Sequence, residues 1–185
     1  MWISKRSLVI GLLAAMTALG MMLAVGAFGA AGGGKAAKHS RPGSQKHGKR
    51  HGAPLIKESL APSQPTDPAF HGVSPGAAPW VLKRGEVRLK SDGKLTLRVK
   101  GLVIPIAPGN GTPGPVNTIS ASLYCGADTN TTATDTTDQV PISRKGDARI
   151  KDKTFTVPAT CLAPVILVHP NGDGTHYIAV DGWRL

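Results

Sequence analysis

From residue 80 onward, hydrophobic and polar side chains alternate along the chain with a period of two. In the segments 87–90 and 95–100, Val or Leu alternates with Lys, Arg or Thr, and Ser91-Asp92-Gly93 lies between the two segments. This pattern is typical of two antiparallel strands joined by a tight turn, with one apolar and one polar face. The sequence therefore predicts a β-hairpin across residues 87–100.

Short apolar runs continue to the C-terminus, and none of them after residue 72 repeats with the 3.6-residue period of a helix. We expect further strands at residues 102–106, 119–125, 140–142, 148–150, 155–157, 165–168 and 177–180, and we expect Trp183 to seal the core. Seven to nine short strands at this spacing predict an all-β domain over residues 73–185. The expected architecture is an antiparallel β-sandwich, Ig-like or related, with a small barrel as the alternative.

The N-terminal segment has the pattern of an export signal. Lys5 and Arg6 precede a run of apolar and small residues over 8–31, and no further charge occurs before Lys35. Residues 1–31 are therefore expected to form a hydrophobic helix that is either a cleaved signal peptide or a retained membrane anchor. The flank that follows the apolar run is more basic than the flank before it. If the helix is not cleaved, the positive-inside rule would keep residues 35–57 in the cytoplasm, which conflicts with export.

Residues 32–72 are rich in Gly, Pro, Ser, Lys and His and contain no sustained apolar periodicity. Such a segment has no face to bury, so we predict a disordered basic linker. The net charge of +11 is densest here, with seven Lys or Arg against Glu58 and Asp67. The linker is either a solvated spacer or an electrostatic anchor for an anionic surface.

Two cysteines, Cys125 and Cys161, are the only ones in the chain. An even number of cysteines behind an export signal predicts a disulfide. Closing a loop of this length would stabilise the fold by about 4 kcal/mol in the chain-entropy model. No CxxC sequence is present, which argues against a redox-active pair.

The polar face of the predicted hairpin is rich in cations. The candidate residues are Lys83, Arg84, Arg88, Lys90, Lys94, Arg98 and Lys100. Like charges opposite one another destabilise a sheet, so this face indicates binding to an anionic cell-wall polymer or a membrane surface. The alternative is a solvated face that Glu86 neutralises in part. No aromatic residues alternate with the cations, which argues against specific nucleic-acid recognition.

His169 and His176 flank the turn at residues 171–174 and could lie opposite each other across a hairpin. With Asp173 they form a candidate metal site. No GxSxG sequence marks a nucleophile, so an exported hydrolase or a metal-binding protein is only the alternative function. No cofactor is expected.

Four runs of residues, 78–81, 99–105, 160–164 and 168–172, resemble small exported actinobacterial β-sandwich proteins of unknown function. The resemblance implies a β-domain outside the cytoplasm and implies no activity. We therefore expect an exported, non-catalytic domain, secreted or held on the outer side of the cell envelope, with a binding or structural role.

Overall fold

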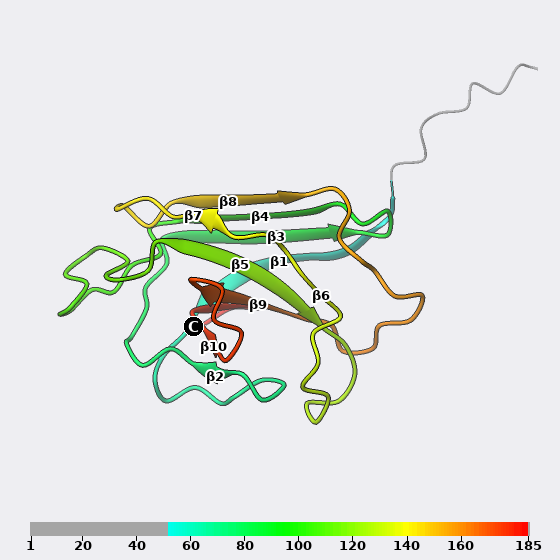
Figure 1. The fold of residues 1–185 in the computed structure, drawn as a ribbon, viewed down its shortest axis with the longest axis horizontal. Helices are drawn as coiled ribbons and strands as arrows, with labels where there is room; N and C mark the ends of the chain where they lie inside the picture. The colour runs from blue at the N-terminus through cyan, green and yellow to red at the C-terminus, as the bar shows by residue number, and fades with distance from the viewer. Residues whose placement is uncertain (1–51, 185) are drawn as a thin grey trace, which may run out of the picture. The chain divides into compact units, whose positions relative to one another are not determined.

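The computed structural model describes residues 52–184, which form strands and contain no helix (Figure 1). The predictions for residues 1–31 and for the first part of the linker therefore lie outside the described residues. Within 52–184, no helix is long and apolar enough to cross a membrane. The strands are β1 (Pro54–Pro62), β2 (Ser74–Pro75), β3 (Arg84–Lys90), β4 (Leu95–Lys100), β5 (Thr118–Tyr124), β6 (Asp135–Thr136), β7 (Val140–Pro141), β8 (Ala148–Asp152), β9 (Val165–Pro170), β10 (His176–Tyr177) and β11 (Ala179–Asp181).

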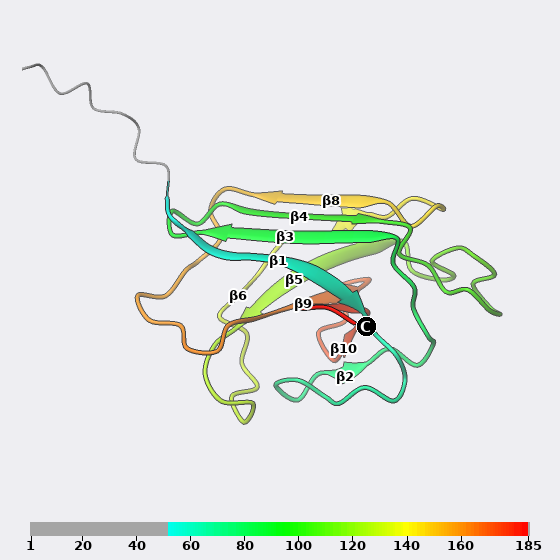
Figure 2. The same ribbon diagram turned by 180° about the vertical axis from the view of Figure 1, so that it is seen from behind.

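Nine of these strands form one antiparallel sheet, which confirms the predicted all-β class. Eight strands follow one another in the order β6-β5-β9-β11-β1-β3-β4-β8, and β7 also pairs with β5. The sheet curls, so that β1, β3, β4 and β8 lie across β5 and β9 (Figures 1 and 2). A small parallel pair, β2 and β10, lies beside the β9 part of the sheet.

Strand β1 belongs to both parts of the curled sheet. Residues 54–59 pair with β3, and Leu60–Pro62 pair with β11. The predicted domain boundary at residue 73 is therefore wrong, because the fold includes a central strand inside the predicted linker. Ile56 and Leu60 are buried but lie four residues apart, so the strand lacks the simple alternation that identifies β3 and β4.

The predicted hairpin is confirmed as β3 and β4, with Gly93 at a positive φ in the turn. The inward Val and Leu side chains of both strands are at most 1% exposed. They pack against β5 and β9 in the main core. Strand β5 departs from the predicted alternation because it is buried on both faces. Its second face lies under a smaller cluster, which contains Tyr124, Leu167, Tyr177 and Val73.

Two predicted strands do not form, and one residue predicted to lie in the core is exposed. Residues 102–106 form only isolated bridges, Val81 with Val103 and Ile104 with Thr112. Residues 155–157 are irregular, although Phe155 is buried and its amide donates to the carbonyl of Gly93. Trp183 is 74% exposed because it follows the last strand, whereas Trp80 is 3% exposed and lies in the core.

Candidate functional site

The outer surface of strands β1, β3, β4 and β8 is strongly basic. Successive residues of a strand point to opposite faces, and the inward positions here are occupied by the core. Strand pairing places the outward residues on one surface, which we call the basic face. Its residues are Lys57, Ser59, Arg84, Glu86, Arg88, Lys90, Thr96, Arg98, Lys100, Arg149 and Lys151. Eight of them are Lys or Arg, and Glu86 is the one acid.

The strand register places cations beside cations. Arg98 on β4 lies directly opposite Arg149 on β8. Arg84 lies opposite Lys100, and Lys57 lies opposite Arg88. Directly opposed side chains have Cβ atoms about 5 Å apart, and like charges at this separation destabilise a sheet. The basic face therefore costs folding free energy.

Glu86 neutralises only part of this charge. Its carboxylate lies 2.9 Å from the Arg84 guanidinium and 4.0 Å from that of Arg88. Within residues 52–184 no salt bridge involves Arg98, Lys100, Arg149 or Lys151. A shallow groove of about 310 Å³ lies over the middle of the face, lined by Glu86, Arg88, Thr96, Arg98 and Arg149.

The structure sorts the seven cations that the sequence singled out. Arg84, Arg88, Lys90, Arg98 and Lys100 lie on the basic face as the period of two requires. Lys94 lies in the hairpin turn, and its ammonium pairs with the Asp92 carboxylate. Lys83 precedes β3 at an exposed position outside the strand register.

Three cations of the basic face were missed by the sequence analysis: Lys57, Arg149 and Lys151. Arg149 and Lys151 alternate with Ala148 and Ile150, so the sequence does indicate that they point outward. The sequence does not indicate that β8 pairs with β4, because these two strands are far apart in the chain. Lys57 was missed because β1 was assigned to the linker.

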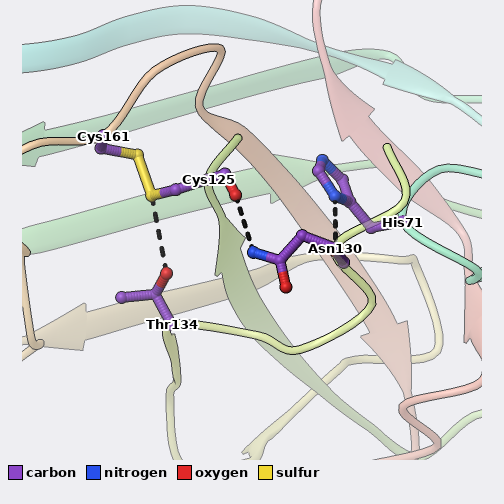
Figure 3. The surroundings of a disulfide bond; sticks show 5 residues. All are labelled: His71, Cys125, Asn130, Thr134 and Cys161. Carbon is purple, nitrogen blue, oxygen red and sulfur yellow. Dashed lines mark hydrogen bonds between the residues drawn. A yellow bond between two sulfur atoms is a disulfide. The ribbon is translucent and has the colours of Figure 1, made fainter. Parts of the chain in front are cut away.

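The predicted disulfide between Cys125 and Cys161 is present and joins the end of β5 to the segment before β9 (Figure 3). Asn130 donates its side-chain amide to the Cys125 carbonyl at 2.9 Å, and the Thr134 hydroxyl lies 3.5 Å from the Cys125 sulfur. The Asn130 carbonyl in turn lies 2.9 Å from the Nδ1 atom of His71, whose ring stacks on Tyr124. The Cys125–Cys161 disulfide therefore has a structural role, and its presence is compatible with an oxidising location.

The structure does not form the predicted metal site. His169 is 1% exposed, and its Nδ1 lies 2.8 Å from the backbone carbonyl oxygen of His176. Burial lowers the pKa of His169, so the ring is neutral and donates this hydrogen bond. The His176 side chain instead bonds Asp173. Residues 52–184 contain no group of three His, Cys, Asp or Glu side chains that could hold a metal ion.

An apolar cleft of about 490 Å³ lies beside His176 and Asp173. Its walls include Trp80, Ile104 and Pro170. Hydrogen bonds from Thr175, together with the bond to His176, lower the pKa of Asp173 to about 2. Both Asp173 and the Thr175 hydroxyl contact the Nδ1 atom of His176.

A Ser-His-Asp relay needs the carboxylate at one ring nitrogen and the nucleophile at the other. No hydroxyl or thiol in the described residues bonds the Nε2 atom of His176. Among the described residues, His176 and Asp173 therefore do not form a Ser-His-Asp relay.

Comparisons with known proteins give no match: no protein-family model matches the chain, and neither curated proteins nor solved structures provide a similar protein.

Proposed function

We propose that the protein is an exported, non-catalytic binding module whose basic face binds an anionic polymer of the cell envelope. The observation that carries the proposal is the composition of this face, eight Lys and Arg residues against Glu86. A polyanion would relieve the repulsion between the opposed cations, and this relief would add to the affinity.

Protection of a sheet edge is the simpler explanation for some of these charges. Strand β8 ends the sheet, and charged side chains on an edge strand prevent pairing with other chains. That explanation accounts for Arg149 and Lys151 only. It does not account for Arg98 or Arg88, which lie on interior strands, and so the proposed binding role remains the better explanation of the whole face.

Three observations support export and the finer description of the fold. The disulfide is compatible with an oxidising location. The N-terminal sequence has the basic and apolar pattern of an export signal. The two facing parts of the sheet enclose one core, as the layers of a β-sandwich do. We therefore propose a sandwich-type domain that is secreted or held at the outer side of the envelope.

The proposal is tested by binding of the full chain, kept soluble in a nonionic detergent, to isolated cell envelope across a salt titration. The variant R88Q/R98Q/R149Q removes three charges from the groove. Its matched control, R144Q/K145Q/K153Q, removes three charges from exposed turns at the ends of β8. We expect the groove variant to bind roughly tenfold or more weakly at low salt, because each lost contact contributes several tenths of a kcal/mol or more.

The control variant is expected to bind nearly as well as the natural chain, and high salt is expected to release both. Equal weakening of the two variants would show that net charge alone drives the binding. Binding that is insensitive to salt and to both variants would remove the basic face from the proposal. Circular dichroism and thermal unfolding of each variant show that the fold is retained.

A further inference from the structure

The charge of the basic face is distributed unevenly between its strands. On β3, Arg84 and Arg88 both have Glu86 as a neighbour. On β4 and β8, no carboxylate of the described residues forms a salt bridge with Arg98 or Arg149, although Glu86 lies opposite Arg98 in the strand register. The positive potential is therefore expected to be strongest along β4 and β8, at one side of the groove.

The register of β4 and β8 arranges these cations in successive levels. Lys151 lies at the level of Thr96, Arg98 and Arg149 share the next level, and Lys100 lies two residues further along β4. Two residues of an antiparallel strand span about 6.8 Å, so the levels repeat at about that interval. A polymer lying along the strands would meet one level of positive charge after another.

Phosphodiester polymers fit this arrangement because their charges lie in the backbone. When one level of cations holds a phosphate, the next phosphate of the polymer is already close to the following level. Few rotatable bonds of the polymer then remain to be ordered. The charges of a polycarboxylate such as polyglutamate are carried on flexible side chains, and each must be ordered separately. A glycerol linker separates successive phosphates by a distance comparable to the interval between levels.

Arginine at the central level also favours phosphate. The guanidinium is a planar fork that donates two parallel hydrogen bonds to the oxygens of a phosphate, whereas the ammonium of lysine acts as a point charge. Because Arg98 and Arg149 lie side by side, a single phosphodiester can accept hydrogen bonds from both through its two non-bridging oxygens.

Other phosphate-bearing partners fit less well. A lipid surface is usually bound by cations together with apolar side chains that enter the bilayer. The exposed apolar residues at this face, Pro54 and Leu55, lie at the start of β1, which β3 separates from β4 and β8. Single-stranded nucleic acid is usually held by aromatic side chains that stack on its bases, and the face has none of these.

Building on the proposed function, we infer that the anionic polymer is a phosphodiester polymer of the poly(glycerol phosphate) type, lying along β4 and β8. Arg98 and Arg149 hold one phosphate between them, and Lys100 and Lys151 contact its neighbours. Glu86 lies opposite Arg98 in the register, on the side away from β8, and repels the polymer from β3. Glu86 therefore confines the bound polymer to the β4–β8 side of the groove.

The test compares the binding of full-length protein in nonionic detergent to poly(glycerol phosphate) and to poly-L-glutamate of matched length and charge. The variant R98K/R149K keeps the charge and removes both guanidinium forks. We expect it to bind poly(glycerol phosphate) roughly fivefold or more weakly and poly-L-glutamate within about twofold of the natural chain. The matched control is R84K, a charge-conserving change on β3, which should leave both affinities within about twofold.

A second variant, E86Q, tests the repulsion of the polymer by Glu86. Removing the one acid of the face should tighten the binding of both polymers several-fold, since it lowers repulsion and frees Arg84 and Arg88. An unchanged or weaker affinity for poly(glycerol phosphate) would overturn the role given to Glu86.

The outcomes separate this inference from the proposed function. If the natural chain binds both polymers and R98K/R149K weakens neither selectively, the phosphate assignment fails and the general polyanion function stands. If the chain binds neither polymer at low salt, both proposals fail. Tighter binding to single-stranded DNA of equal charge, or to phosphatidylglycerol vesicles, would overturn the assignment in favour of nucleic acid or membrane.

Discussion

Asp181 on β11 carries a charge that the fold accommodates poorly. Its carboxylate accepts a hydrogen bond of 2.9 Å from the backbone amide of Ile166. Burial raises the pKa of Asp181 from 3.8 to about 6, the hydrogen bond from Ile166 opposes the shift, and the charge of Glu58 adds to it. At neutral pH the group is therefore ionised in the folded protein at a cost in free energy. The substitution Asp181→Asn removes the charge and retains an oxygen that can accept the bond from Ile166.

The sign and size of the Asp181 contribution to the free energy of unfolding follow from proton linkage. A pKa that is higher in the folded state means that the folded protein binds more protons between about pH 4 and pH 6. The stability that protonated Asp181 contributes is fully present below pH 4 and is lost as pH rises through 6. One pKa unit corresponds to about 1.36 kcal/mol, so the shift corresponds to at most about 3 kcal/mol. Partial solvation of the carboxylate reduces this to roughly 2 kcal/mol.

Urea unfolding at pH 4.0, 5.0, 6.0 and 7.5 measures the effect. We expect Asp181→Asn to unfold at the same urea concentration as the natural protein at pH 4.0. At pH 7.5 it should be more stable by about 2 kcal/mol. The control is Asp173→Asn, because hydrogen bonds lower the pKa of Asp173 to about 2 and its loss should destabilise the fold at pH 7.5. The reasoning is refuted if Asp181→Asn has the same pH dependence as the natural protein.

Three further changes have defined outcomes. Replacing Cys125 and Cys161 together by Ala should lower the free energy of unfolding by about 4 kcal/mol, measured as a shift in the urea midpoint, because the cross-link then no longer restricts the unfolded chain. Arg149→Thr should raise stability by about 0.5 kcal/mol, since it removes the charge opposite Arg98, while weakening binding to poly(glycerol phosphate); equal stability would argue against repulsion across β4 and β8. Burial lowers the pKa of His169, so protonation of its ring opposes the stability that Asp181 contributes as pH falls. His169→Gln should remove this opposing contribution and raise the free energy of unfolding at pH 5 relative to pH 7; an unchanged slope between pH 7 and 5 would contradict this.

The parts of the fold that the sequence predicts are those determined by neighbouring residues. The β3–β4 hairpin is identified by its alternation and by a turn containing Gly93, and both are local features. The disulfide is predictable because the chain has only two cysteines. Five of the seven predicted cations lie on the basic face because the period of two determines their direction.

The parts that the sequence does not predict depend on distant partners. Strand β1 changes partner from β3 to β11 at Leu60, so its buried residues do not alternate. The pairing of β8 with β4 completes the basic face, but the sequence of β8 does not specify its partner. The prediction for the two histidines assumed a hairpin register that places them opposite each other, whereas the observed register pairs Val168 with Ala179.

The position of β1 has a consequence for how the chain reaches its native state. This first strand completes its pairing only when Leu60 meets Asp181 on the last strand, so contacts of very long sequence separation close the sheet. Such contacts form slowly, because the ends of a long chain segment must first be brought together. A chain that passes N-terminus first through an export channel would keep β1 without its β11 partner until nearly all of the domain had crossed. In such a passage, the order of strands would delay completion of the sheet until nearly all of the domain had crossed.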